Sequence, residues 1–182
     1  MDRATEPSVG AIRNVTLANI LAHGPGPSRM HGHVDSPLEN ITLNNVRLTI
    51  DGDAESPLKK GPTALTIENV RNFSLKQVEI EWGALGPDQW HSALVVENAR
   101  GLILDGVSAG PAPTDPDAPA VILKEVQGAT VRNCQAQAGT SAFVHLAGAE
   151  TRDVVLQGND TRLARVAVDR APEVKRTAVR AG

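Results

Sequence analysis

Apolar and polar residues alternate along most of the chain, in short runs that recur in the same phase. Six nine-residue segments align without gaps, and the fourth and sixth residues of each are apolar. Apolar side chains two residues apart share one face of a β-strand, whereas a helix would space them three or four residues apart. The pattern therefore predicts strands. The segments are Ile12–Ile20, Leu38–Val46, Val70–Val78, Ala99–Val107, Val126–Cys134 and Thr151–Asn159.

A second alternating apolar run precedes four of these segments, and in the three middle repeats the spacing between the two runs is constant. Successive segments start 26, 32, 29, 27 and 25 residues apart. A unit of two strands with a corner of fixed length, repeated at this interval, is typical of a β-solenoid. We therefore predict an all-β fold, a right-handed parallel β-helix (single-stranded β-solenoid) of about six coils. The second runs are Leu65/Ile67, Leu94/Val96, Val121/Leu123 and Val144/Leu146.

The interior of this predicted helix is aliphatic, and its corners are rich in Asn and Gly. Asn and Gly adopt left-handed backbone at low cost, and stacked Asn side chains can bond to one another along the rod. Cys134 occupies a position that is Ile or Val in other repeats, so it is predicted to be a small buried hydrophobic residue rather than a nucleophile. The sixth positions should form one interior column, made of Leu17, Leu43, Leu75, Leu104, Val131 and Leu156.

The composition agrees with one globular domain whose core contains few aromatic rings. The chain has 182 residues, of which 41% are hydrophobic and 2% aromatic. Its net charge of -3 argues against a nucleic-acid partner, because such binders usually carry a basic excess. No run of about 18 apolar residues occurs, so no membrane partner is expected. The first residues, Met1–Pro7, are polar and charged, unlike a secretory signal peptide, and the compartment stays unknown.

Charge is distributed unevenly along the chain. Residues 160–182 carry six basic and three acidic side chains, a net of +3 (6 - 3), which leaves -6 for the rest of the chain (-3 - 3). We therefore expect residues 1–159 to form the parallel β-helix and residues 160–182 to form a basic C-terminal tail, frayed in solution, or a terminal cap. A solenoid also exposes a strand edge at each end, so end-to-end self-association is expected.

Longer insertions leave the coils between the strands. They are rich in Gly, Pro, Asp and Ser. In repeat proteins such insertions gather on one face, which is often the binding face, so candidate chemistry belongs there. The insertions are Leu21–Pro37, Thr49–Thr63, Glu81–Ser92, Ser108–Ala118 and Gln135–Ser141.

Two tryptophans enclose one of these insertions, with a histidine beside the second. An exposed indole can stack on the C–H face of a pyranose ring, although a Trp in a corner loop can instead cover the end of a core strand. Basic side chains in two other insertions could contact an anionic polysaccharide or simply be solvated. The candidate substrate-binding residues are Trp82, Trp90, His91, Arg29, His31, Lys59 and Lys60.

Two motifs contain metal-ligand residue types without completing a site. On a strand, His31 and His33 would present both imidazoles on one face, but no third ligand follows at a diagnostic spacing. The run Asp51–Glu55 alternates oxygen ligands as a calcium loop does, but its twelfth position is Pro62 rather than Glu. Structural or solvent-facing histidines and a polar turn are the alternatives. We expect no metal and no cofactor.

The runs Gly10–Ile20 and Ser36–Val46 each contain an Asn-Val/Ile-Thr-Leu phrase, and together they resemble the later coils of glycoside hydrolase family 28. That family contains polygalacturonases and rhamnogalacturonases. Asp88–Leu94 and Ala118–Leu123 are similar to the C-terminal coils of its bacterial members. The resemblance extends over residues 9–159. It implies a right-handed parallel β-helix that contacts a pectic polysaccharide, in a protein of a kind usually secreted or periplasmic.

The catalytic signature of that family is absent from this chain. Its members carry Asn-Thr-Asp, Asp-Asp, Gly-His-Gly and Arg-Ile-Lys in that order, and none of the four strings occurs. The nearest string, His31-Gly-His33, reverses the third. Hydrolysis with inversion needs an acid and a base carboxylate on one face, so we assign no catalytic residue.

The sequence leaves three functions open. The chain can be the C-terminal part of a family 28-like protein, which extends the helix and holds a pectic chain. It can be a non-enzymatic carbohydrate-binding or adhesive β-solenoid. It can also be completed as an enzyme by an upstream catalytic segment or by another chain.

Overall fold

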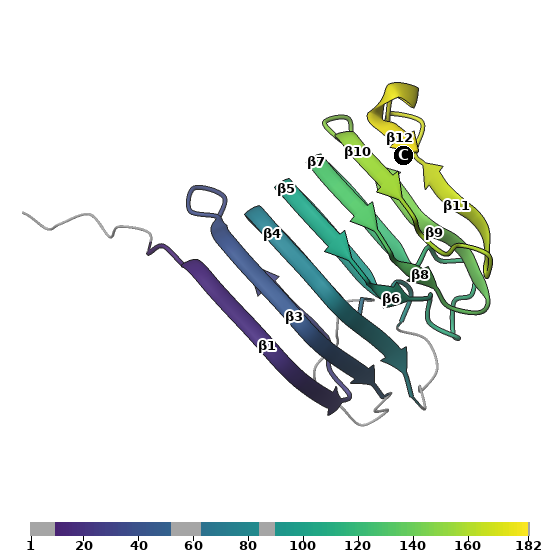
Figure 1. Cartoon of the computed structure of the whole chain (residues 1–182), viewed down its shortest axis with the longest axis horizontal. Coiled ribbons are helices and arrows are strands. Elements are labelled where there is room, and N and C mark those ends of the chain that lie inside the picture. Colours follow the sequence, from purple (N-terminus) through teal and green to yellow (C-terminus); the bar gives the residue numbers. More distant parts are fainter. Residues whose placement is uncertain (1–9, 52–62, 84–89, 182) are drawn as a thin grey trace, which may run out of the picture.

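The computed structural model describes residues 10–51, 63–83 and 90–181, and it is built almost entirely of parallel β-strands (Figure 1). Seven strands form the main path of the sheet, each hydrogen-bonded to the next in chain order, so six turns separate the first from the last (7 - 1). The predicted all-β parallel solenoid of about six coils is confirmed. The seven strands are β1 (Arg13–Gly24), β3 (Leu38–Ile50), β4 (Leu65–Trp82), β5 (Leu94–Asp105), β7 (Val121–Arg132), β10 (Arg152–Gln157) and β12 (Val179–Ala181).

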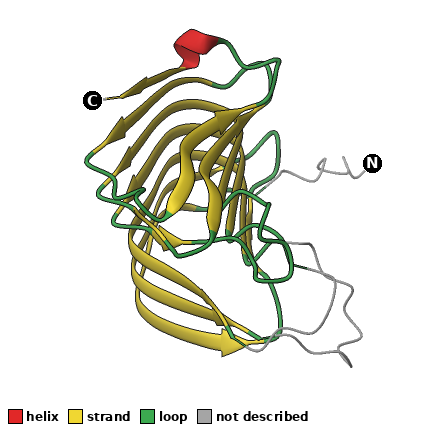
Figure 2. Cartoon of the chain, turned by 90° about the vertical axis from the view of Figure 1, so that its right-hand side faces the viewer, coloured by secondary structure: helices red, strands yellow, loops and turns green. Residues whose placement is uncertain are grey.

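Shorter strands stack beside this path and complete the coils (Figure 2). They are β2 (Ser28–His31), β6 (Ser108–Ala109), β8 (Gln135–Ala136), β9 (Thr140–Ala147) and β11 (Ala164–Arg170). The second alternating run of each repeat also aligns from coil to coil, because Leu65, Leu94, Val121 and Val144 are successive partners across β4, β5, β7 and β9. The curved strands enclose the aliphatic core.

The sixth residues of the six segments form the predicted interior column. From Leu17 on β1 to Leu156 on β10, each is paired with its counterpart on the next strand. Leu75, in the middle of the column, is fully buried, whereas Leu17 is 38% exposed because β3 is the one described strand that pairs with β1. Burying one aliphatic side chain contributes about 1.5–3 kcal/mol, so this column is a main source of stability.

Columns of left-handed residues turn the chain at its corners. Asn14, Asn40 and Asn72 have φ of 58°, 55° and 52°, and Gly101 and Gly128 continue the column. The Asn40 amide donates to Asn14 Oδ1 over 2.9 Å, and the Asn72 amide donates to Asn40 Oδ1 over 3.1 Å. The predicted Asn ladder and corner chemistry are confirmed. A second column occupies the eighth positions: Asn19, Asn45, Gln77, Gly106, Asn133 and Gly158.

A third left-handed column, at Asn69, Asn98 and Glu125, lies outside the six aligned segments. These residues form the corner of fixed length between the two alternating apolar runs of each repeat. The Asn98 amide donates to Asn69 Oδ1 over 2.7 Å, and the Asn69 amide donates to the Gly32 carbonyl over 2.8 Å. This corner therefore has its own hydrogen-bonded ladder.

Residues 160–181 continue the stack. Strand β11 pairs in parallel with β9, and β12 pairs with β10. A short 3-10 helix, η1 (Arg176–Ala178), precedes β12, and Val174 and Ala178 are buried against the core. These residues form strands rather than a frayed tail, because their apolar side chains pack on the preceding coil despite the basic charge.

Cys134 lies in the core, as predicted, with 1% of its surface exposed. The Val107 amide donates to its Sγ over 3.4 Å, and Sγ donates to the Arg132 carbonyl over 3.1 Å. Burial raises the pKa of the Cys134 thiol above its usual range. A thiol that stays protonated and covered is a packing residue.

Candidate functional site

An open groove of about 760 Å³ lies where several insertions leave the coils. Four of the five predicted insertions contribute to its walls, which confirms that they gather on one face. The groove is therefore a candidate site built by the insertions. It is lined by Thr49, Glu79, Glu81, Trp82, Ser108, Pro111, Pro113, Gln135, Ala136, Gln137, Ala138 and Leu163.

The last residues of β4 supply the two carboxylates of the groove. Val78 and Ile80 point into the core, so the alternation of the strand turns Glu79 and Glu81 outward on the same face. Arg47 on β3 donates to Glu79 from Nε over 2.8 Å and lies 2.7 Å away through Nη2. The hydrogen bond and charge of Glu79 raise the pKa of Arg47 above its ordinary value.

The polar wall of the groove comes from strands one and two coils further along. The Gln137 amide donates to the Ile80 carbonyl over 2.9 Å and to Ser108 Oγ over 3.3 Å. Thr49 donates to Glu81 over 3.4 Å. These contacts hold carboxamide, hydroxyl and carboxylate groups side by side, and all three types form hydrogen bonds with sugar hydroxyls.

Trp82 and Trp90 have different roles in the structure. Their rings pack at a tilt of 58° with centroids 5.6 Å apart. Trp82 is half-buried, lines the groove, and donates from Nε1 to the Gly110 carbonyl over 3.0 Å. Trp90 is 4% exposed and belongs to the core. The assignment of Trp90 to substrate stacking is therefore wrong, because it has no open face; the packing role that we gave as its alternative is the one observed.

The other candidate binding residues lie outside this groove. His91 is exposed and is hydrogen-bonded through Nδ1 to Asp115. Arg29 and His31 belong to β2, which pairs with the beginning of β4, at the far end from the groove carboxylates. Lys59 and Lys60 fall outside the described residues. Of the described members of this set, the structure brings only Trp82 into the groove.

The metal-ligand motifs do not gain ligands on folding. His31 Nδ1 lies 3.4 Å from Glu68, and His33 Nδ1 lies 3.7 Å from Asp35. Asp51 is bonded to His23, and the rest of the Asp51–Glu55 run is outside the described residues. Within residues 10–51, 63–83 and 90–181, no group of three or more His, Cys, Asp or Glu side chains is arranged to hold a metal ion. Those same residues include no helix long and apolar enough to cross a membrane.

Sequence reasoning missed Glu79, Glu81 and Gln137 as groove residues. The insertion boundaries at 81, 108 and 135 did indicate where the groove lies. The side chains that line the groove depend on how the loop after β6 folds back over β4. No local sequence pattern predicts the path of that loop.

Comparisons with known proteins assign neither a family nor a function to this chain. No family model matches the chain, and no curated protein matches it. One solved structure, a putative glycosyl hydrolase from Parabacteroides merdae ATCC 43184, aligns over 87% of this chain and 80% of that chain, with 10% sequence identity and a TM-score of 0.41. The likeness is weak. It carries no argument about activity, and membership of family 28 receives no support from it.

Proposed function

We propose that this chain binds carbohydrate through the groove and that its ligand is an uncharged glycan chain. The observation that supports this is the half-buried indole of Trp82 in a groove whose lining is divided between apolar residues and hydroxyl, amide and carboxylate groups. A flat apolar surface beside convergent hydrogen-bonding groups suits the C–H face and hydroxyls of a sugar ring.

The charges of the groove favour an uncharged ligand. Glu79 and Glu81 are the charged side chains that line it. Arg47 forms an ion pair with Glu79 at 2.7 Å and also interacts electrostatically with Glu81, so one negative charge is left in excess. The carboxylate of a uronic acid would be repelled by Glu81, and such repulsion is stronger beside a low-dielectric protein wall than in bulk water. A neutral hexose or pentose polymer meets no such opposition.

The second candidate is the function implied by the family 28 resemblance, in which these coils extend a helix and hold a pectic chain. It rests on the Asn-Val/Ile-Thr-Leu phrases of the first two repeats. A pectic chain is a polyanion, so it would have to occupy a surface other than this groove. We propose binding without hydrolysis in both cases, since the family's catalytic strings are missing.

A glycan-binding screen followed by calorimetry tests the proposal. Neutral oligosaccharides of glucose, xylose, mannose and galactose are compared with oligogalacturonate. We expect a neutral chain to bind, and Trp82→Ala to weaken it about tenfold, a loss consistent with removing one stacking ring. Trp82→Phe keeps a ring and should retain most of the affinity. Arg165→Ala, an exposed change outside the groove lining, is the matched control.

The outcomes separate the candidates. Preferred binding of oligogalacturonate would favour the pectic alternative over our proposal. Equal affinity in Trp82→Ala, with an unchanged melting temperature, would overturn the groove as the site. Release of reducing ends from any of these glycans would show that the chain hydrolyses its ligand.

A further inference from the structure

One outward-facing row of side chains runs along the stack at the second position of each repeat. Its members are partners in register on successive strands, so their side chains are neighbours at the spacing of adjacent strands, about 4.8 Å. The row is Arg13, Glu39, Arg71, Arg100, Gln127 and Arg152.

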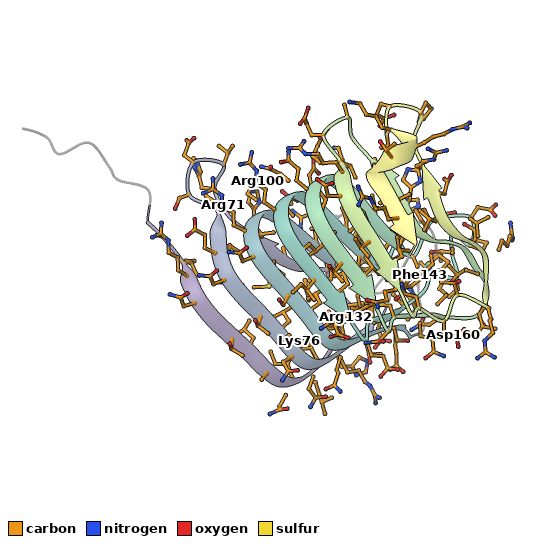
Figure 3. The ribbon with its side chains drawn as sticks, turned by 45° about the horizontal axis from the view of Figure 1, so that its top comes forward. Arg71, Lys76, Arg100, Arg132, Phe143 and Asp160 are labelled. Atoms are coloured by element: carbon orange, nitrogen blue, oxygen red, sulfur yellow. The ribbon has the colours of Figure 1, made fainter. Side chains whose placement is uncertain are left out.

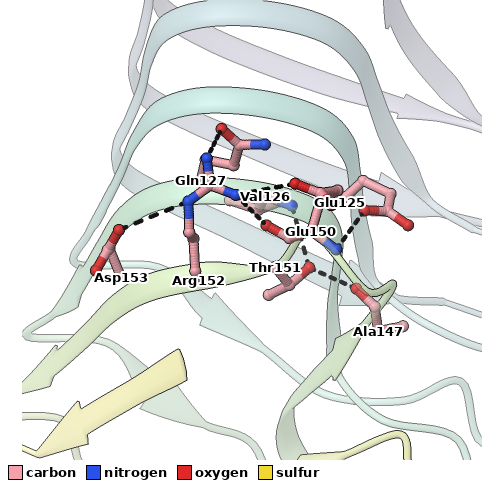
Figure 4. Close-up of polar contacts among 8 residues, drawn as sticks. All are labelled: Glu125, Val126, Gln127, Ala147, Glu150, Thr151, Arg152 and Asp153. Carbon is pink, nitrogen blue, oxygen red and sulfur yellow. Dashed lines mark hydrogen bonds and ion pairs between the residues drawn. The ribbon is translucent and has the colours of Figure 1, made fainter. Parts of the chain in front are cut away.

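In most neighbouring pairs of this row, a positively charged side chain lies beside a hydrogen-bond acceptor. Glu39 lies between two arginines, 3.0 Å from Arg13 Nε and 3.5 Å from Arg71 Nη1. At the other end, Arg152 donates to Gln127 Oε1 over 2.7 Å and lies 3.0 Å from a Glu150 oxygen, as Figure 4 shows. The charged side chains in these two parts of the row therefore have partners within the protein.

The step from Arg71 to Arg100 is different. The two guanidinium groups come from directly opposed residues of β4 and β5, and both side chains are exposed. Figure 3 shows them beside each other at one edge of the sheet. Arg71 shares Glu39 with Arg13, whereas no carboxylate of the described chain contacts Arg100. Like charges on directly opposed residues of two strands destabilise the sheet. Arg71 and Arg100 therefore lack an acidic group between them that would offset their repulsion.

Other charged rows of the molecule show how such a conflict is normally avoided. Lys76, Asp105 and Arg132 are in register, and Arg132 donates to Asp105 over 2.9 Å. The like-charged neighbours Glu68 and Glu97 each have a basic partner on the other side: His31 at 3.4 Å from Glu68 and Lys124 at 2.8 Å from Glu97. The Arg71–Arg100 step has no equivalent compensation.

A hollow of about 240 Å³ opens at this same step. The two arginines and the carboxamides of Asn69 and Asn98 supply its polar side, and Val34, Pro37 and Val70 supply the apolar side. The two carboxamides belong to the corner ladder, where the Asn98 amide donates to Asn69 Oδ1 over 2.7 Å. The hollow is thus a preformed concavity with two cations and fixed amide groups.

We propose that this hollow is a binding site for one oxyanion, a carboxylate or a sulfate, held between the guanidinium groups of Arg71 and Arg100. The planar fork of a guanidinium matches two oxygens of such a group, and charge-assisted bonds of this kind are the stronger class of hydrogen bond. A bound anion also removes the repulsion between the two arginines. The site shares no lining residue with the groove, so it stands independently of the proposed function.

The source of the anion can be a free ion or the charged group of an acidic sugar, and the experiment distinguishes them. Sulfate, glucuronate and neutral glucose are titrated into the chain at constant ionic strength, and binding is followed by calorimetry and by NMR of arginine side chains. We expect sulfate and glucuronate to bind and glucose not to bind. Equal affinities indicate that the charged group alone is recognised, and tighter glucuronate binding indicates that the sugar ring also contacts the hollow.

Three variants test the residues. Arg100→Gln should weaken anion binding about tenfold, the effect of losing one charge-assisted hydrogen-bonding group. Arg132→Gln removes the same charge from a row that is already paired and should leave anion binding unchanged. Arg100→Glu should abolish anion binding and raise the melting temperature without anion, because the new carboxylate would face Arg71.

Equal losses of affinity in Arg100→Gln and Arg132→Gln would show a net-charge effect and overturn the site. Absence of binding by both anions, or a melting temperature lowered by Arg100→Glu, would overturn it as well.

Discussion

The middle of the stack and its first strand carry the same sequence pattern but differ in burial. Leu75 on β4 and Leu17 on β1 occupy the same position of the repeat and the same interior column. The first has a coil on both sides and is fully buried, and the second has a coil on one side and is 38% exposed. Burial in a solenoid therefore depends on the neighbouring coils as much as on the residue itself.

The C-terminal end of the stack differs from the N-terminal end. Strands β11 and β12 and the helix η1 cover the last long coil, so Val154 is fully buried. At β1 the column stays open, and Leu17 on that strand is 38% exposed. Within the described residues, one end is closed by the chain's own apolar residues and the other presents a free strand edge.

Truncation of the interior column gives the largest expected effect. Leu75→Ala leaves a cavity between two coils and should lower the free energy of unfolding by about 3–4 kcal/mol. Leu17→Ala removes a side chain that water already reaches and should cost about 1 kcal/mol or less. Urea denaturation followed by circular dichroism measures both. Similar losses in the two variants would contradict the idea that the neighbouring coils determine burial.

The second-largest expected effect concerns self-association through β1. We propose that two copies pair their β1 strands antiparallel about a two-fold axis between residues 18 and 19. Leu17 of one copy then lies opposite Ile20 of the other, and Val15 opposite Ala22, all four in columns that face the core.

Sedimentation velocity at increasing concentration should therefore show a dimer. Leu17→Lys, which places a charge in the open column, should yield a monomer with little change in secondary structure. A monomer at every concentration of the unaltered chain would rule out this pairing.

In the Asn ladder, the difference in stability loss between a variant in the middle of the stack and one at its edge should be smaller. Asn40 donates to Asn14 and accepts from Asn72, while its backbone is left-handed. Asn40→Ala loses both bonds and the tolerance for positive φ, and should cost about 1–2 kcal/mol. Asn14→Ala loses one bond and should cost less. Thermal unfolding measures the difference, and Asn40→Gly, which restores the backbone tolerance, should recover part of the loss.

The smallest effect is at the closed end, in the turn before β11. The Arg162 guanidinium lowers the pKa of Asp160 to about 2 through its hydrogen bonds. The pKa of an unfolded Asp is about 3.9, so the ionised pair stabilises the fold above that pH and the contribution is lost as the pH falls towards 2.

Melting temperatures between pH 5 and about 2 should therefore decline more in the unaltered chain than in Asp160→Asn. Both side chains of the pair are exposed, so we expect a slight difference. An identical decline in both proteins would show that the pair does not act on stability.

Most of the fold could be predicted because each coil repeats its local signals. Alternation predicted the strands, and Asn14, Asn40 and Asn72 predicted left-handed corners. The third corner column was missed because Glu125 interrupts its asparagines and the column lies between the aligned segments. For residues 160–182 the sequence left a frayed tail or a terminal cap open, because the basic charge obscured the alternation of Val166 and Val168, which pair with β9.

The candidate site could be predicted in position but not in composition. The insertions indicated where the groove lies, yet Trp82 and Trp90 are equivalent in sequence as loop-flanking aromatic residues. Which of them stays open depends on packing between coils, where Trp90 is covered and Trp82 reaches the Gly110 carbonyl. The pairing of Arg71 with Arg100 also becomes visible only when the register of β4 and β5 is known.

The uniform register means that this molecule can change length only in whole turns. Residues 100–126 form one such turn, because Arg100 on β5 is matched by Gln127 on β7. Loss of that stretch would set Arg71 beside Gln127 and Leu75 beside Val131, so the rod would be shorter while every hydrophobic layer still met a hydrophobic layer. The paired arginines would vanish with it, which makes that surface chemistry separable from the architecture that carries it.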